Sequence, residues 1–177
     1  MMKYEEVKVN SERWFDLKPL LNEEFRDIVG YEGKYQVSNY GRVKSLERKV
    51  YRNNKTNIKF TKYREKILLQ VQKGIKQNQK YYTVAIYNQG KRRDKKVHIL
   101  VAEVFLDKND FKSMLDEDRK LINLKKLQVN HKDENSSNNF VENLEWCTHK
   151  YNCNYGTRIE RIRKTKLKKG GDKEWIC

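Results

Sequence analysis

The sequence has little of the residues that build linkers, disulfide scaffolds or fibrous repeats. Its 177 residues include one proline, eight glycines and three cysteines. So few prolines and glycines exclude a collagen-like or low-complexity architecture. The cysteines, Cys147, Cys153 and Cys177, are odd in number and lack a framework spacing. We therefore expect reduced thiols and a cytoplasmic location.

Long apolar runs are also missing. No stretch of about 18 apolar residues occurs, so no membrane partner is expected. The N-terminus, MMKYEEVKVNSERW, is too polar for a secretory signal. Hydrophobic residues make up only 37%, but three Trp, six Phe and eleven Tyr supply bulk for a core. The length predicts one compact domain or two small modules.

The charge is strongly one-sided. Lys and Arg total 40 against 24 Asp and Glu, which gives a formal net charge of +16. Residues 42–96 hold eighteen basic and three acidic residues, and residues 150–169 hold eight basic residues and one acidic residue. Such blocks bind phosphates by releasing counterions, so nucleic acid is the expected partner and salt should weaken binding steeply. A solvated face is the alternative interpretation of any short charge run.

Turn formers and alternating apolar residues predict a β-rich first half. Residues 14–24 weakly favour a short helix, and 35–37 and 42–45 suit the two strands of a hairpin. Residues 48–64 are polar and are expected to form a loop that is either mobile or in contact with DNA. Strands are expected at 67–72, 81–87 and 95–97, with a turn at 88–90.

Apolar residues then recur at helical spacing over 97–105, which predicts a short buried helix. Residues 107–126 mix charges and resemble an insertion. His98 lies among the apolar residues of the helix and is expected to pack or cap there. No internal repeat is present.

The stretch from 127 to 156, LQVNHKDENSSNNFVENLEWCTHKYNCNYG, carries the chemistry. Strands at 128–132 and 144–148 and a helix from Lys150, with Thr148 as a possible N-cap, would bring Asn130 and His131 toward Asn152. Amide oxygens suit a hard cation such as Mg²⁺. A histidine beside it can take a proton from water near neutral pH.

These residues resemble the HNH nucleases of the ββα-metal fold, especially phage homing endonucleases. The likeness lies in Asn130-His131 followed by Asn143 and Asn152, within VNHKDENSSNN, VENLEWCTH and NCNYGTRIERIRK. The segment FRDIVGYEGKYQVSNYGRVKSLER resembles the modular DNA-binding domain fused ahead of such nucleases, and VHILVAEVFL resembles the helix that joins the two. The resemblance covers roughly residues 25–164.

The resemblance implies a role for each matching residue. His131 would be the general base that activates the attacking water, and Asn143 would hold the loop that places His131; these two are the candidate catalytic residues. Asn130 and Asn152 would bind one Mg²⁺ or Mn²⁺ ion. The products would be 3′-hydroxyl and 5′-phosphate ends. Many members have Asp where this chain has Asn130, and a neutral amide attracts a cation less strongly.

Basic side chains of the two charge blocks are expected to contact DNA, mostly at phosphates. A ribbon of two or three strands fits the major groove, so the hairpin region is expected to read sequence. The candidate DNA-binding residues are Arg42, Lys44, Arg48, Lys49, Arg52, Lys91, Arg92, Arg93, Arg158, Arg161, Arg163 and Lys164.

Cys147, His149 and Cys153 lack the paired spacing of a four-ligand zinc site, so no structural zinc is expected. His149 is equally compatible with a phosphate contact and with plain solvent exposure.

The sequence therefore predicts an α+β fold: a small antiparallel β-rich DNA-binding module, a ββα-metal nuclease motif, and a basic C-terminal helix or tail. The expected divisions are an N-terminal extension (1–24), the DNA-binding region (25–96), the nuclease domain (97–156, with the insertion at 107–126) and the tail (157–177).

The expected function is site-specific, homing-type cleavage of duplex DNA. A monomer is favoured and should nick, because one site attacks one strand, whereas a dimer could cut both. The alternatives are a noncatalytic sequence-specific DNA-binding protein and a structure-selective or nonspecific HNH nuclease.

Overall fold

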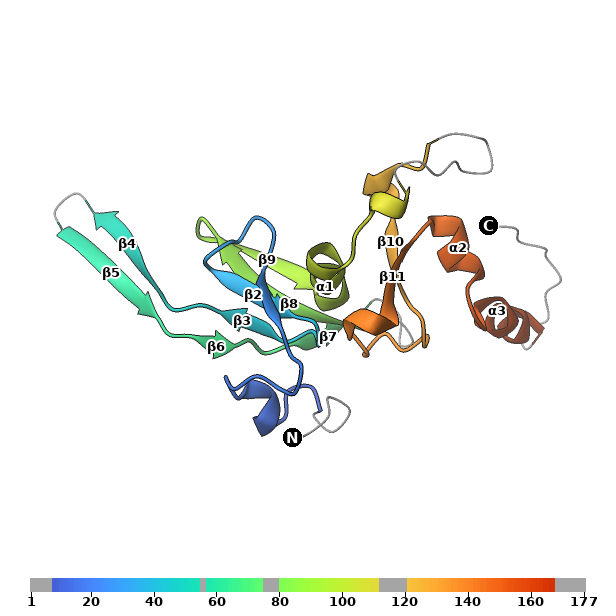
Figure 1. Cartoon of the computed structure of the whole chain (residues 1–177), viewed down its shortest axis with the longest axis horizontal. Helices are drawn as coiled ribbons and strands as arrows, with labels where there is room; N and C mark the ends of the chain where they lie inside the picture. Colours follow the sequence, from blue (N-terminus) through green and yellow to red (C-terminus); the bar gives the residue numbers. More distant parts are fainter. Residues whose placement is uncertain (1–7, 55–56, 75–79, 112–120, 168–177) are drawn as a thin grey trace.

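The computed structural model of the chain describes residues 8–54, 57–74, 80–111 and 121–167. Within these ranges, the side chains of residues 52–54, 57–59, 110, 158, 161 and 165–167 are not described. The architecture is α+β, with short antiparallel strands and few helices (Figure 1). Among the described helices, none has the length and apolar character needed to cross a bilayer.

Two small antiparallel sheets form the body of the first half. One has the order β1 (Phe25–Asp27), β2 (Tyr35–Ser38), β3 (Val43–Ser45) and β6 (Lys66–Ile67). The other has the order β7 (Val71–Lys73), β8 (Tyr81–Asn88) and β9 (Lys91–Lys96). The hairpin at 35–45 and the turn at 88–90 lie where the sequence predicts them, and Gln89 and Gly90 both have positive φ, as a tight hairpin turn requires.

The strand predicted at 67–72 is wrong in one respect, because residues 68–70 interrupt it. β6 ends at Ile67 and β7 begins at Val71, and the two belong to different sheets. The buried Gln70 lies in this break and donates from Nε2 to the Gly41 carbonyl at 2.6 Å. The chain therefore passes from the first sheet to the second at residues 68–70, and the hydrogen bond from Gln70 to Gly41 holds this crossing in place.

Helix α1 (Val97–Phe105) closes the main core. Its buried Leu100 and Val101 belong to one apolar cluster with Val37 of β2, Ile86 of β8 and Leu144 of the second half. This helix, which the sequence predicts correctly, therefore packs the two halves of the chain together (Figure 1). Burial of each large apolar side chain contributes roughly 1.5–3 kcal/mol to folding.

A two-stranded arm replaces the loop expected at 48–64. β4 (Arg48–Asn54) pairs with β5 (Asn57–Tyr63) in an antiparallel ladder, and the pair projects from the body (Figure 1). Val50 pairs with Thr61, and Tyr51 pairs with Phe60, whose ring centroid lies 6.0 Å away. These β-branched and aromatic pairs stabilise the ladder although their side chains are exposed.

The N-terminal segment is mostly irregular. A 3₁₀ turn covers Glu12–Phe15, but no helix follows to residue 24 as the sequence weakly favoured. Pro19 disfavours helical geometry at the residue before it, and Asn22 has a φ of 59°, so the chain cannot continue as a helix. Trp14 and Leu20 nonetheless lie in a second core cluster with Tyr40 and Ile67.

The second half is a hairpin followed by two helices. β10 (Gln128–His131) pairs with β11 (Leu144–Cys147), and α2 (His149–Asn154) and α3 (Arg158–Leu167) follow. The Thr148 side chain accepts a hydrogen bond from the backbone nitrogen of Tyr151, so Thr148 is the N-cap of α2 as predicted. Further 3₁₀ turns occupy Asn109–Phe111, Leu124–Lys126 and Val141–Asn143.

Candidate active site and nucleic-acid interface

Asn130 lies on β10 with its amide fixed by a neighbour on β11. Its Nδ2 donates to Glu145 Oε1 at 2.7 Å, and the two residues are register partners in the hairpin. A carboxylate only accepts hydrogen bonds, so the Asn130 nitrogen must face Glu145. The Asn130 oxygen consequently points elsewhere, and it has no hydrogen-bond partner among the described residues.

Asn152, on α2, is held in a similar way. Its Nδ2 donates to Gln128 Oε1 at 2.8 Å, and Gln128 Nε2 lies 3.1 Å from His149 Nδ1. Gln128 and Asn130 are two residues apart on β10, so they share the face of the hairpin that α2 covers. The Asn152 oxygen likewise lacks a hydrogen-bond partner within the described chain.

This donor set fits a hard divalent cation. Among the described residues, the amide oxygens of Asn130 and Asn152 have no protein partner, and Mg²⁺ and Mn²⁺ prefer oxygen ligands. The Glu145 carboxylate, one hydrogen bond from Asn130, adds negative charge nearby. The described residues contain no group of three or more His, Cys, Asp or Glu side chains placed to hold a metal.

His131 is buried at the end of β10. Its Nε2 lies 3.3 Å from Asn139 Oδ1, which assigns the proton to Nε2 and leaves the lone pair on Nδ1. Burial lowers the pKa of His131 below its usual value of 6.5, although the Asn139 bond and the charge of Asp133 act in the opposite direction. The imidazole is therefore neutral at neutral pH, as a general base must be.

His131 lies against groups of helix α1 and strand β8. Its ring centroid lies 5.0 Å from that of His98 and 6.2 Å from that of Tyr81.

Asn143 closes the loop between the two strands. Its Nδ2 donates to Asp133 Oδ1 and to the Asn138 carbonyl, both at 2.9 Å, and its Oδ1 accepts from the Asp133 backbone nitrogen at 3.0 Å. Its carbonyl accepts from the Lys132 nitrogen at 2.8 Å. These hydrogen bonds hold the backbone immediately after His131, as side-chain to backbone bonds of asparagine commonly do in loops.

Three further titratable side chains lie near the site: His98, His149 and Cys147. His98 is buried and packs on Tyr81, but its Nδ1 has no hydrogen-bond partner within the described part of the chain. His149 is exposed and lies 3.5 Å from Cys153 Sγ through Nε2. Burial raises the pKa of the Cys147 thiol to about 11, so this thiol stays protonated.

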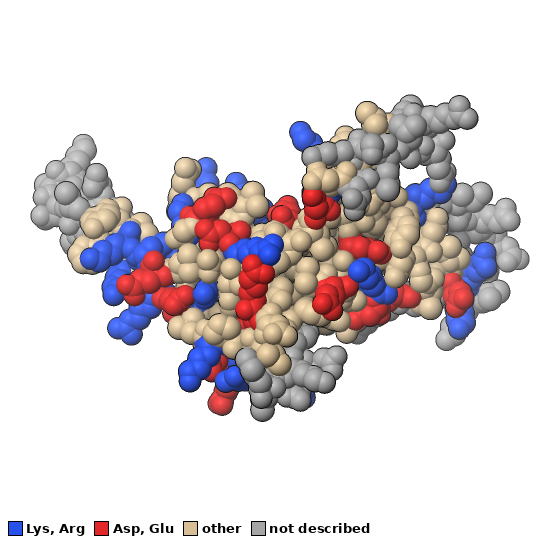
Figure 2. Space-filling model, viewed as in Figure 1, with Lys and Arg blue, Asp and Glu red and all other residues tan. Residues whose placement is uncertain are grey.

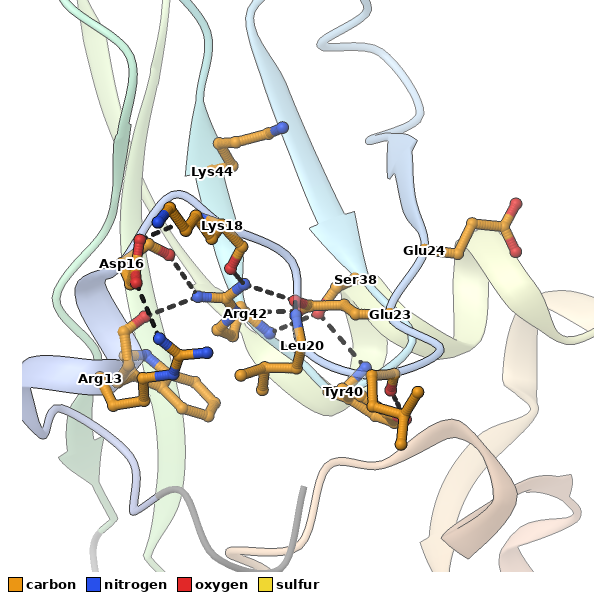
Figure 3. Close-up of polar contacts among 12 residues, drawn as sticks. Arg13, Asp16, Lys18, Leu20, Glu23, Glu24, Ser38, Tyr40, Arg42 and Lys44 are labelled. Carbon is orange, nitrogen blue, oxygen red and sulfur yellow. Dashed lines mark hydrogen bonds and ion pairs between the residues drawn. The ribbon is translucent and has the colours of Figure 1, made fainter. Parts of the chain in front are cut away.

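Arg42 does not contact DNA, so that prediction is wrong. Its side chain is fully buried, and it donates to the carboxylate of Glu23 and to the carbonyls of Trp14, Asp16 and Lys18 (Figure 3). Arg42 therefore ties the irregular N-terminal segment to the first sheet. The sequence alone does not distinguish the buried Arg42 from an exposed arginine, because its acidic partner Glu23 lies nineteen residues away in the chain.

Two more candidate DNA contacts are half-buried and already engaged. Lys44 pairs with Glu65 at 3.3 Å and lies over the Phe25 ring. Arg48 Nη2 donates to the Tyr35 hydroxyl at 3.0 Å, and the guanidinium lies 4.8 Å from the centroids of the Tyr35 and Tyr63 rings. Both residues therefore stabilise the base of the arm.

The other candidates lie on the arm, β9 and α3. The exposed ones are Lys49, Lys91, Arg92, Arg93, Arg163 and Lys164. The side chains of Arg52, Arg158 and Arg161 lie outside the described part of the structure. Figure 2 shows Lys and Arg gathered around the arm and its base on the left, whereas Asp and Glu are spread over the middle of this face.

Sequence reasoning missed Gln128, Asn139 and Glu145. Strand periodicity could have found Gln128, because it lies two residues before Asn130 on the same face. Glu145 becomes visible only when the hairpin register is known, since it is the partner of Asn130 across the ladder. No sequence signal marks Asn139, which lies in an irregular loop.

Comparison with known proteins finds a family model that matches part of the β-rich first half and a relative that matches a longer stretch of the chain. Residues 23–87 match the family model described as the NUMOD4 motif. The chain is 33% identical over 129 residues to DNA endonuclease I-HmuI of Bacillus phage SP01. Over 73% of its length the chain is therefore similar to a phage homing endonuclease.

The match to I-HmuI covers 73% of this chain and 55% of the relative, so the chain spans about half the length of that protein. A solved structure that describes DNA binding and cleavage by the HNH homing endonuclease I-HmuI also matches. It has a TM-score of 0.46 and 30% identity, and the match covers 81% of this chain and 68% of that one.

Proposed function

We propose that this chain is a metal-dependent DNA endonuclease that hydrolyses phosphodiester bonds in duplex DNA, of the site-specific homing type. The observation that carries the proposal is the end of β10. There, the amide oxygens of Asn130 and Asn152 have no partner among the described residues, and the adjacent His131 is a buried neutral imidazole. The relative I-HmuI, a DNA endonuclease, supports the same class of reaction.

Asn130 and Asn152 would hold one Mg²⁺ or Mn²⁺ through their amide oxygens. Bound there, the ion would stabilise the negative charge that develops on the leaving 3′ oxygen. Gln128 and Glu145 contact the nitrogens of these amides, so the oxygens remain available.

His131 is the general base in this proposal. Its Nδ1 takes a proton from the attacking water, while Asn139 holds the Nε2 side of the ring and Asn143 fixes the loop behind it. The water oxygen bonds to phosphorus as the bond to the 3′ oxygen breaks. This step leaves 3′-hydroxyl and 5′-phosphate ends.

The arm and β9 supply the DNA-binding surface. The exposed Lys49, Lys91 and Arg93 contact phosphates, and the two-stranded arm has the shape that enters a major groove. With one site per chain, a monomer nicks one strand, and a dimer or a second event is needed to cut both.

Cleavage and binding measured on the same end-labelled duplex test the proposal. His131→Ala should bind DNA as the unmutated protein does and should lose Mg²⁺-dependent cleavage. If the unmutated protein binds tightly but never cuts with Mg²⁺ or Mn²⁺, a noncatalytic DNA-binding protein replaces this proposal. Equal cleavage of random, branched and native duplexes would replace site-specific cleavage with a nonspecific or structure-selective reaction.

A further inference from the structure

An asparagine ligand has two ends, and only one of them binds a cation. The oxygen of the amide coordinates a metal, whereas its nitrogen carries two hydrogens and repels one. A site built from Asn130 and Asn152 therefore depends on how each amide is turned. An aspartate at the same place would need no such control, because its two oxygens are equivalent.

Glu145 is placed to set the orientation of the Asn130 side-chain amide. The two residues are opposite each other in the β10–β11 ladder, and the contact from Asn130 Nδ2 to Glu145 Oε1 is 2.7 Å long. Both side chains are largely shielded from solvent, and within the described chain Glu145 forms no ion pair with Lys or Arg. The carboxylate accepts from the amide and also interacts with Tyr151.

Gln128 acts on the second amide in the same way. Its Oε1 accepts from Asn152 Nδ2 at 2.8 Å, and its own nitrogen is directed to His149 Nδ1 at 3.1 Å. This arrangement requires Nδ1 of the exposed His149 to be the unprotonated ring nitrogen, so that it accepts from Gln128. Each amide nitrogen in the site has an acceptor from this chain, and each amide oxygen is left for a ligand.

We propose that Glu145 and Gln128 are positioning residues that present the oxygens of Asn130 and Asn152 to the divalent ion. The inference rests on the proposed function, since it concerns the same metal site. It also accounts for the neutral Asn130: the negative charge is carried by Glu145, one hydrogen bond behind the ligand, and not by the ligand itself.

Mn²⁺ binding to the DNA-free protein, followed by electron paramagnetic resonance of the free ion, tests the inference without any cleavage assay. Glu145→Gln keeps an acceptor oxygen, whereas Glu145→Leu removes it. Each variant is made in the natural chain and in an Asn130→Asp background, where position 130 has two equivalent oxygens and no amide to orient. Gln128→Glu and Gln128→Leu form the matching pair for Asn152.

The expected result depends on the background. Glu145→Leu should weaken Mn²⁺ binding about tenfold in the natural chain, and Glu145→Gln should stay within about threefold. In the Asn130→Asp background, Glu145→Leu should cause no loss, because the ligand needs no orientation and a like charge is removed. That result also shows that the leucine variant folds. Gln128→Leu should weaken binding, and Gln128→Glu should retain it.

Three other results would overturn the inference. Equal losses for Glu145→Gln and Glu145→Leu in both backgrounds would make Glu145 a direct ligand. Unchanged binding in Glu145→Leu would remove its role while leaving the proposed nuclease function intact. Absence of Mn²⁺ binding by the unmutated protein would instead remove the metal site itself, and the proposed function would fall with it.

Discussion

Arg42 shows how a single buried side chain can hold an irregular segment in place. Its guanidinium meets one carboxylate and three carbonyls, and both Arg42 and Glu23 have side chains that are fully shielded from solvent. Loss of either partner would leave a charge buried without compensation.

We therefore expect Arg42→Ala to lower the free energy of unfolding by about 3–5 kcal/mol. Arg42→Lys should restore little of this free energy of unfolding, since an ammonium cannot reach the same set of acceptors. Urea denaturation measures both effects. Arg13→Ala is the matched control: its pair with Asp16 is exposed, so the cost should be below about 1 kcal/mol. A cost for Arg42→Ala as small as that of the control would contradict this role.

His98 should make the stability depend on pH. Burial, with the nearby charges of His131 and Lys96, lowers the pKa of His98 from 6.5 to about 3. Between these values the unfolded chain binds a proton that the folded chain does not, so stability falls as the pH drops below 6.5. The part due to His98 should reach about 2 kcal/mol at pH 5.

Unfolding free energies of the natural chain and of His98→Phe at pH 7 and pH 5 check this prediction. The drop between the two pH values should be smaller in the variant by about 2 kcal/mol. The same drop in both proteins would show that His98 is already protonated in the fold.

At the scale of elements, the turn between β2 and β3 supports the loop of the active site. The Val141 nitrogen donates to the Asn39 carbonyl at 2.8 Å, and the Tyr40 ring lies 5.0 Å from the Phe140 ring. Gly41 has a φ of 83°, and a Cβ there would lie 3.0 Å from Asn139 Cβ. Asn139 in turn holds His131.

Gly41→Ala should therefore reduce both stability and kcat. A positive φ alone costs about 1–2 kcal/mol for alanine, and displacement of Asn139 should add a loss of activity. Gly33→Ala is the control, because its φ of 67° carries the same strain but no atom lies within 4 Å of the added Cβ. Chemical denaturation and cleavage rates separate the two effects. Equal rates in both variants would mean that the turn does not position the loop.

The cationic strand β9 gives a second prediction at this scale. Lys91 and Arg93 are exposed, whereas Arg92 is paired with Asp94 at 3.0 Å. If both contact phosphates, the Lys91→Ala/Arg93→Ala variant should lower the slope of log K against log salt by about 2, since each contact contributes about 0.9. Binding isotherms at several salt concentrations measure the slope. Lys18→Ala, an exposed lysine in the N-terminal segment, should leave it unchanged. An unchanged slope in the double variant would place the DNA elsewhere.

Elements that bury one face were predictable from sequence, and those that bury none were not. β8 and α1 carry clear periodicity because they line the main core. The arm β4–β5 is exposed, so its strands show no alternation, and the break at residues 68–70 depends on a side chain bonding to a distant turn.

The candidate site was likewise only partly predictable from sequence. His131, Asn130, Asn143 and Asn152 follow from residue types and from the family resemblance. The contacts of Asn130 with Glu145 and of His131 with Asn139 depend on hairpin register and loop geometry, which spacing along the chain does not encode.

On the scale of the whole molecule, the two halves are joined by shared cores. Leu144 of β11 packs in the main cluster with strands of the first half, and Phe140 packs against the cluster of Trp14 and Tyr40. The β-rich first half and the hairpin with α2 are thus held in a fixed relation, which would let the proposed nuclease cut at a set distance from the sequence that it reads.

Conversion of supercoiled plasmid carrying the native target is the most direct test of this account. The protein and His131→Ala are compared with Mg²⁺, with Mn²⁺ and with EDTA. We predict open circles as the first product with either ion, and none with EDTA or with the variant. Cleavage that persists in His131→Ala, or in EDTA, would contradict the account.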